Sequence, residues 1–286
     1  MKILHLFTSL VFAGTLTAQS GPPPAPIPPS LTADAIMARV AANQDRSEAL
    51  RREFVYQQHI HIVTHKPGGR LMREETSDYD VTPMPEGTEK KLTVLTGRYW
   101  HKGKYEAFSG EPVPEDDSLD GDLIKDFRDS LGDDKSKDGL GKDLFPLTSE
   151  EQKDYAFQLL GEETQDGRHV YHIGFRPKDK KEITWAGEAY IDAAEFEPVR
   201  VFTKLSRRIP LLVRAMLGTD LPGIGFNVVY QRQADDVWFP ATFGTEFRLR
   251  AVFFINREIS ISLENSGFER THVKSTIKML PTDKDR

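Results

Sequence analysis

The sequence predicts a mainly β protein of the α+β class, in which an N-terminal helix precedes a single large, curved antiparallel sheet that forms an open half-barrel. Two observations predict this fold. From residue 54 onward, strand-forming residues recur with a period of two, and short turn-forming segments separate successive runs. A parallel sheet needs a crossover of about a dozen residues or more between strands, whereas only two connections in this chain are that long.

The first 18 residues match the pattern of a cleavable secretory signal peptide. They contain one lysine, an apolar stretch from Ile3 to Leu16, and small residues before a cleavage site expected after Ala18. The chain has no cysteine, so neither a lipobox anchor nor a disulfide can form. Because no later apolar run is long enough to span a bilayer, we expect a periplasmic or secreted protein that is not an integral membrane protein.

The folded domain is predicted over residues 31–286, after a proline-rich linker over 19–30. Its first element is a helix over 32–50, for which Thr32 is a suitable N-cap. The apolar residues that follow repeat at helical spacing. The predicted buried face of this helix consists of Ile36, Met37, Val40 and Ala41.

About ten strands follow as consecutive antiparallel hairpins. Turn-forming residues predict hairpin turns at 67–69, 102–104, 165–167 and 235–236. A further hairpin covers 186–201, and the last two strands are predicted over 252–265 and 268–280. In the first strand, the buried face is predicted to consist of Phe54, Tyr56, Ile60 and Ile62.

An acidic insertion over residues 111–151 interrupts the strands. Between Gly110 and Phe145 the sequence has twelve acidic and five basic residues, so this segment accounts for essentially all of the net negative charge of the chain. The remainder has no basic stripe, which argues against nucleic acid as a partner; the insertion itself is a candidate surface for a protein partner. One apolar face predicts a helix here that ends at Gly132 and could act as a lid. That face consists of Leu119, Leu123, Ile124, Phe127 and Leu131.

The second long connection, residues 209–222, is unusually apolar. Because loops are normally polar, it should either cover an apolar surface or expose one. The ligand-binding residues predicted in and near this connection are Phe202, Arg207, Arg208, Leu211, Leu212, Met216 and Leu217. The arginines could engage an anionic lipid head group while the apolar residues contact the chain; the alternative is a basic rim beside a packed loop.

Two stretches resemble a known family. In "GEAYIDAAEFEPVRV" a glycine, an aromatic residue and Ile191-Asp192 precede a turn and then Pro198-Val199-Arg200; "VVYQRQADDVWFPATF" places a turn before a tryptophan and a proline. With the layout of a helix followed by a meander, these motifs are similar to those of the LolA-like superfamily of periplasmic lipoprotein carriers, outer-membrane lipoprotein-sorting proteins and lipid-sensing regulators. The acidic insertion and the apolar connection depart from the family pattern.

The resemblance implies a half-open barrel with an apolar concave side, closed by helices acting as a lid, that binds acyl chains or other hydrophobic groups. We therefore expect a non-catalytic binding or carrier protein for a hydrophobic small molecule, a lipid or a lipidated protein, with no cofactor. The alternative is a regulatory or protein-interaction module on the same fold, whose barrel is filled. The sequence has no nucleophile elbow, zinc-protease motif or phosphate-binding glycine loop, so we expect no enzyme.

Two patterns are weak metal-site candidates. His59, His61 and His65 share one face of a strand, as zinc ligands can, but the alternating apolar residues place that face toward solvent. Residues 134–145 begin like a calcium loop, but Phe145 stands where a bidentate glutamate is needed. We favour a solvated strand face and a solvated acidic loop over metal sites.

Overall fold

The computed structural model describes residues 31–84, 87–110, 119–132, 145–181, 184–206, 219–220, 224–251 and 255–271. Residues Thr32–Arg286 belong to one compact unit. The described elements are α1 (Ala33–Arg51), β1 (Phe54–His65), β2 (Leu71–Met84), β3 (Gly87–His101), β4 (Lys104–Ser109), α2 (Leu119–Gly132), η1 (Glu151–Asp154), β5 (Tyr155–Gln165), β6 (Arg168–Pro177), β7 (Trp185–Asp192), β8 (Pro198–Leu205), β9 (Thr219–Asp220), β10 (Gly225–Arg232), η2 (Ala234–Asp236), β11 (Trp238–Ala251) and β12 (Ile255–Arg270).

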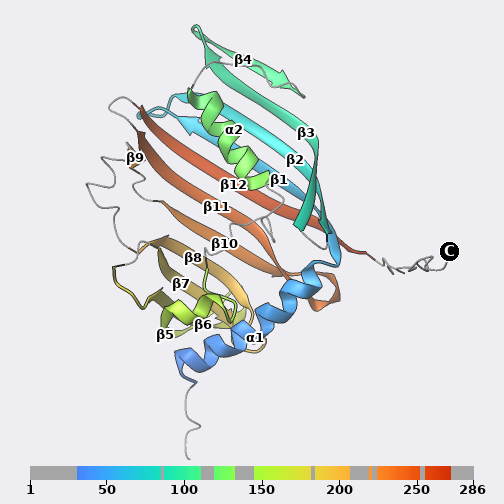
Figure 1. Ribbon diagram of the computed structural model, residues 1–286, viewed down its shortest axis with the longest axis vertical. Coiled ribbons are helices and arrows are strands. Elements are labelled where there is room, and N and C mark those ends of the chain that lie inside the picture. The colour runs from blue at the N-terminus through green and yellow to red at the C-terminus, as the bar shows by residue number, and fades with distance from the viewer. Residues whose placement is uncertain are drawn as a thin grey trace, which may run out of the picture. The chain divides into compact units, whose positions relative to one another are not determined.

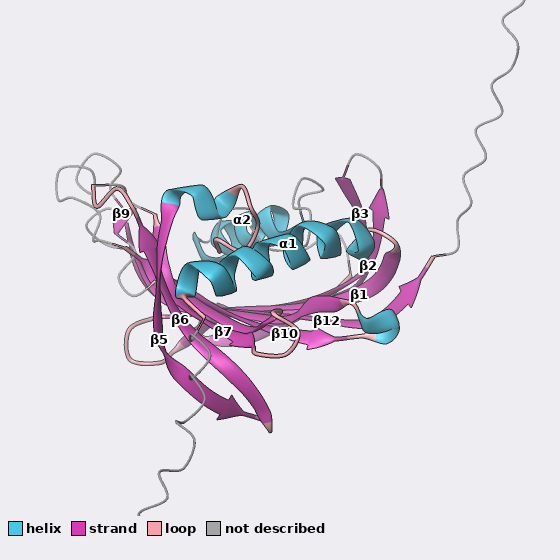
Figure 2. Ribbon diagram, turned by 90° about the horizontal axis from the view of Figure 1, so that it is seen from below, coloured by secondary structure: helices cyan, strands magenta, loops and turns pink. Residues whose placement is uncertain are grey.

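The twelve described strands form one antiparallel sheet (Figure 1). Eleven of them lie in the order β4-β3-β2-β1-β12-β11-β10-β8-β7-β6-β5, and the two-residue β9 pairs with β11. The pairing of β1 with β12 therefore joins an N-terminal meander to a C-terminal one. Figure 2 shows that the sheet curves around α1 and α2, which both lie on its concave side. The predicted fold class, an open half-barrel with two helices, is confirmed.

Alternation along the strands separates a covered face of the sheet from an exposed one. In β1 the side chains predicted to be buried are 8% exposed or less, whereas the side chain of His59 between them is 52% exposed. The same alternation buries Val201 in β8 and Leu263 in β12. Each fully buried aliphatic side chain contributes roughly 1.5–3 kcal/mol, so the covered face is the main source of stability.

Helix α1 forms where it is predicted, and its bounds differ by one residue. The hydroxyl oxygen of Thr32 accepts a hydrogen bond from the backbone N–H of Ala35 at 3.2 Å, which is the N-cap expected from the sequence. The four residues of the predicted apolar face are all buried: Ile36, Met37, Val40 and Ala41.

Helix α2 also forms inside the acidic insertion and ends at Gly132 as predicted. Ile124 from its apolar face is completely buried. Phe127 meets Phe247 of β11 edge to face, with ring centroids 6.0 Å apart. The apolar face of α2 therefore packs on the covered face of the sheet, as a lid would.

Strand β8 is approached closely by both of its neighbours. A Cβ atom on Gly187 of β7 would lie 1.9 Å from the carbonyl oxygen of Phe202, and one on Gly225 of β10 would lie 2.3 Å from that of Thr203. Only glycine fits at these two positions without a shift of the backbone. The glycine of the family-like motif is thus explained by close strand contact.

The end of the sheet differs from the sequence prediction. Residues 255–265 of the first predicted strand and 268–270 of the second belong to the single strand β12, and Gly267, at the expected break, has a φ of 65°. Residues 252–254 and 272–280 of the two predicted strands lie outside the described part of the chain. The pairing of β1 with β12 shifts register between Val55 and Gln57, which lie opposite Glu269 and Ser266. Gly267 and Phe268 together lie opposite Tyr56, so the chain forms a β-bulge here and not a turn.

Candidate ligand-binding site

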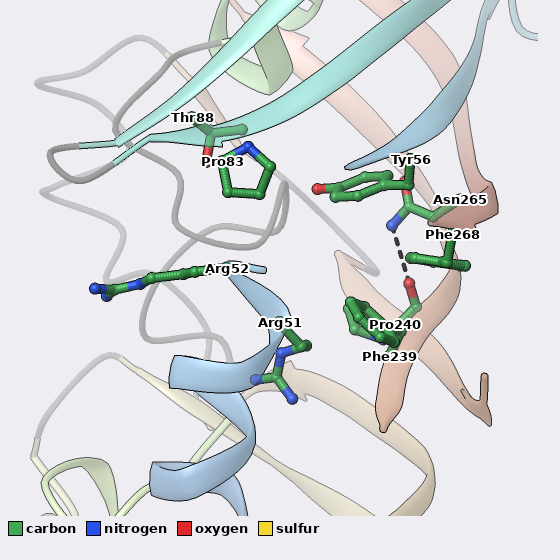
Figure 3. A pocket seen from close by; sticks show the side chains of 9 residues that line it. All are labelled: Arg51, Arg52, Tyr56, Pro83, Thr88, Phe239, Pro240, Asn265 and Phe268. Carbon is green, nitrogen blue, oxygen red and sulfur yellow. Dashed lines mark hydrogen bonds between the residues drawn. The ribbon is translucent and has the colours of Figure 1, made fainter. Parts of the chain in front are cut away.

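A pocket lies where the C-terminal end of α1 meets strands β1, β2, β3, β11 and β12 (Figure 3). Its empty volume is ≈ 330 Å³, including space open to solvent. The residues that line it are Arg51, Arg52, Tyr56, Pro83, Thr88, Phe239, Pro240, Asn265 and Phe268. They come from the two ends of the domain's sequence, and the β1–β12 pairing brings them together.

One wall of the pocket is aromatic. The ring centroids of Phe239 and Phe268 are 4.3 Å apart, and those of Tyr56 and Phe268 are 5.3 Å apart. Behind them, Phe54 meets Phe239 edge to face at 5.1 Å. Each such aromatic pair contributes about 0.5–1.5 kcal/mol beyond its buried area. The wall is therefore a packed apolar surface, in which Tyr56 and Phe239 are buried and Phe268 is half-buried.

Fixed polar groups lie beside this wall. The side-chain amide of Asn265 donates to the carbonyl oxygen of Pro240 at 2.9 Å, and its oxygen accepts from Gln58 Nε2 at 3.0 Å. The guanidinium of Arg51, a residue only 7% exposed, donates to the carbonyl oxygen of Trp238 at 3.2 Å. These contacts hold Asn265 and Arg51 in place before any ligand binds.

Helix α1 is anchored near the pocket by the buried carboxyl group of Glu197, which follows the β7–β8 turn. Gln44 Nε2 donates to Glu197 Oε2 at 2.5 Å, and Ser47 Oγ donates to Oε1 at 3.5 Å. Burial raises the pKa of Glu197 to about 7, although the bond from Gln44 and the charge of Arg51 act in the opposite direction. Glu197 therefore titrates near neutral pH.

The β7–β8 turn itself is shaped by the aspartate of the family-like motif. Asp192 Oδ1 accepts from the backbone N–H groups of Ala194 and Glu195, both at 2.9 Å. Asn43 of α1 then donates to the carbonyl oxygens of Glu195 and Phe196, at 2.7 and 3.1 Å. The motif thus builds the surface on which α1 docks.

The ligand-binding residues predicted from the sequence do not line this pocket. Phe202 is 44% exposed, whereas its neighbours Val201 and Thr203 are fully buried, so Phe202 lies on the exposed face of the sheet. Residues outside the described part of the chain are Arg207, Arg208, Leu211, Leu212, Met216 and Leu217. The predicted signal peptide, the predicted linker and residues 134–144 of the calcium-like loop also lie outside it. Of the apolar connection, β9 is described, and it pairs with β11.

Sequence reasoning did not find the pocket residues, although two signals were present. Arg51 and Arg52 are adjacent cations at the end of the predicted helix, and Phe239-Pro240 belongs to the second family-like stretch. Asn265 had no such signal, because a polar residue in an alternating strand normally faces solvent. Its burial follows from its place on the covered face of β12.

The strand histidines face solvent, as predicted. His59 Nδ1 lies 2.6 Å from Asp78 Oδ1, and His61 Nε2 lies 3.0 Å from Glu74 Oε1. Both acidic partners, Asp78 and Glu74, lie on β2, and the sequence alone did not identify them as partners of the histidines. Within the described ranges, no group of three or more His, Asp or Glu side chains is arranged to hold a metal ion.

No protein-family model matches the chain, and no curated protein matches it. The chain is similar to the crystal structure of a DUF1329 family protein from Desulfovibrio piger, with 12% identity and a TM-score of 0.39, over 86% of this chain and 95% of that one. It is similar to an outer membrane lipoprotein-sorting protein domain from Vibrio parahaemolyticus (14% identity, TM-score 0.33, 80% and 91% covered). It is also similar to a LolA superfamily protein from Nitrosomonas europaea, with 12% identity and a TM-score of 0.32, over 85% of this chain and 96% of that one.

These solved structures include one of the LolA superfamily, the family that the two sequence stretches resemble; at these identities and TM-scores the likeness carries no conclusion about the family or function of this chain. In the part of the chain that the structure describes, no helix combines the length and the apolar character needed to cross a membrane.

Proposed function

We propose that this chain is a non-catalytic, periplasmic or secreted binding protein for a hydrophobic ligand, either a lipid or a lipidated protein. The pocket at the end of α1 is part of its binding site. The observation that carries the proposal is the packed aromatic wall beside an opening to solvent. Sites for small ligands are typically apolar, with a few fixed polar groups that set orientation, and Asn265 and Arg51 supply such groups here.

The size of the pocket limits what it holds. Its ≈ 330 Å³ of empty space includes space open to solvent, so only part of that space is enclosed by protein. The pocket therefore suits one end of an amphiphile, and the rest of the ligand extends beyond the residues that line it. Each methylene that becomes buried adds roughly 0.8 kcal/mol, so even partial burial of an acyl chain gives measurable affinity.

A second candidate function is a regulatory or protein-interaction module whose sheet is filled by its own side chains. The packing of the covered face favours it, because Ile60, Ile62 and Leu263 are at most 2% exposed. In this case the protein binds its partner on an outer surface, and the pocket stays empty.

Mild purification followed by native mass spectrometry separates the two candidates. We expect bound lipid, and saturable uptake of a fluorescent fatty acid by the delipidated protein. Phe268→Asp, which places a charge in the half-buried aromatic wall, should weaken that uptake at least about ten-fold. Leu160→Asp is the matched control, because Leu160 is an exposed apolar residue on edge strand β5. Protein without lipid that takes up no fatty acid would sink the binding proposal.

A further inference from the structure

The pocket wall is positively charged. Of the nine residues that line it, two are arginines and none is acidic. Arg51 is buried, and its guanidinium donates to Gln44 Oε1 and to the carbonyl oxygen of Trp238, so Arg52 is the cation that is more exposed to a ligand. In Figure 3 the side chain of Arg52 extends away from Tyr56, Phe239 and Phe268, so the cation and the aromatic rings are separated within the lining of the pocket. This is the arrangement that an amphiphile requires.

Arg52 is available to a ligand. Its guanidinium lies 3.1 Å from the carboxylate of Glu48, one helical turn earlier, and the two side chains are 45% and 27% exposed. An exposed ion pair of this kind contributes about 1 kcal/mol or less, so an incoming anion can share or replace Glu48 at little cost. The planar guanidinium has donors for a bidentate contact with a carboxylate or a phosphate.

Other charges near the end of α1 are already compensated. Glu53, next to Arg52 in the chain, accepts from Arg270 Nε at 2.8 Å, and Arg270 also contacts Asp235 at 3.2 Å. The carbonyl end of α1 carries a partial negative charge and repels anions. Attraction for an anion must therefore come from the arginine side chains. Removing one of them should weaken the binding of anionic amphiphiles and leave the binding of neutral ones unchanged.

From these observations we infer that the pocket recognises an anionic head group, and that its ligand is a single-chain amphiphile ending in a carboxylate or a phosphate. The head group binds Arg52 at the mouth, and the first methylenes lie against Tyr56, Phe239 and Phe268. This inference rests on the proposed function and specifies the ligand class of the same pocket.

The test compares amphiphiles that share one chain and differ in the head group: dodecanoate, dodecyl phosphate, dodecanol and dodecylamine. Each is titrated at low salt and alkaline pH against the full mature chain loaded with a neutral fluorescent probe. We expect the two anions to displace the probe at concentrations about ten-fold lower than dodecanol, and dodecylamine to be weakest. The ratio of the concentrations at which dodecanoate and dodecyl phosphate displace the probe then distinguishes a fatty acid from a phosphate-bearing lipid as the ligand.

Arg52→Gln should remove the preference for anions and leave the affinity for dodecanol unchanged, since it removes the charge and keeps a polar side chain. Arg248→Gln is the control, because Arg248 is an exposed arginine of β11 that does not line the pocket. Thermal unfolding of both variants verifies that they fold.

Equal affinity of the wild-type chain for dodecanoate and dodecanol overturns the head-group inference and leaves the proposed function standing. An anion preference that survives Arg52→Gln also overturns it, because Arg52 is then not the recognition group. Failure of all four compounds to bind overturns the inference together with the proposed function.

Discussion

Helices α1 and α2 both lie on the concave side of the sheet, yet different forces hold them there (Figure 2). Helix α1 is held mainly by apolar burial, because its stripe of four apolar side chains is at most 4% exposed. The polar groups that accompany the stripe, Gln44 and Ser47, contact the carboxyl group of Glu197, whose pKa is raised by burial to about 7.

Helix α2 is held by paired charges at two points along its length. The guanidinium of Arg257 from β12 donates two hydrogen bonds to Asp120, at 2.7 and 2.8 Å. Two turns later, Arg128 contacts Glu75 of β2 at 2.7 Å. Of the side chains described on its apolar face, only that of Ile124 is fully buried.

The difference teaches how each helix is placed. Burial of apolar surface is non-directional and nearly independent of salt, so volume and shape position α1. Buried ion pairs contribute little net stability, because desolvation offsets their attraction, but they strongly penalise any arrangement that separates them. The acidic insertion is therefore oriented by charge, whereas the N-terminal helix is held by its core.

The largest expected loss of stability comes from removing one partner of the Arg257–Asp120 ion pair, and its absence would break this comparison. Arg257→Ala leaves the carboxylate of Asp120, which is 4% exposed, without its bidentate partner. We expect the free energy of unfolding to fall by about 3–5 kcal/mol, measured by urea denaturation, with loss of amide protection in α2.

The double replacement Asp120→Leu with Arg257→Met is the control for this prediction. It removes both charges together, so most of the stability should return. A loss below about 1 kcal/mol in Arg257→Ala alone would show that the pair does not orient α2.

An intermediate effect sharpens the description of the α1 anchor. The pKa of Glu197 is about 7 when folded, against an ordinary value of 4.5, so the folded state binds this proton more tightly than the unfolded chain. The stabilisation is full below the unfolded value and is lost as pH rises through about 7. We expect urea denaturation to show a loss on the order of 2–3 kcal/mol between acidic and alkaline pH, which Glu197→Gln should abolish.

Glu246→Gln serves as the matched control, since Glu246 is an exposed carboxylate on β11. Its pH dependence should match that of the wild type. If Glu197→Gln also retains the full pH dependence, then Glu197 is not the group that titrates, and the anchor of α1 is apolar only.

The smallest expected effect tests whether exposed charge on α2 contributes to the free energy of unfolding. Lys125 and Asp129 form an i,i+4 pair at 3.0 Å, with side chains 64% and 56% exposed. Asp129→Asn should change the free energy of unfolding by less than about 0.5 kcal/mol, because solvent screens exposed pairs. A loss above about 1 kcal/mol in the same urea assay would remove the distinction between the buried and exposed pairs of this helix.

Local features of the sequence predicted most of the fold. The N-cap Thr32, the helical spacing after it and the alternating strands were all correct, because each depends on neighbours a few residues away. The break expected near Gly267 was wrong for the same reason. A Ser-Gly pair can form a turn or a bulge, and only its pairing with β1 decides between them.

The candidate site was less predictable than the fold. The apolar connection was a reasonable candidate, since loops with such composition need a partner surface, but the pocket lies elsewhere. It is formed by the end of α1 and by strands from both ends of the domain. No pattern within a single element indicates that Arg52 and Phe268 share an opening.

By itself, the sequence determined most of the elements, the antiparallel hairpins between neighbouring strands and the class of fold, because periodicity and turn chemistry act locally. Tertiary structure alone decided that Arg257 meets Asp120, that Glu197 is buried under α1, and that two arginines stand beside an aromatic wall. These contacts join residues far apart in the chain. Their chemistry depends on burial and on charges that come together only when β1 pairs with β12 and the sheet curves around its helices.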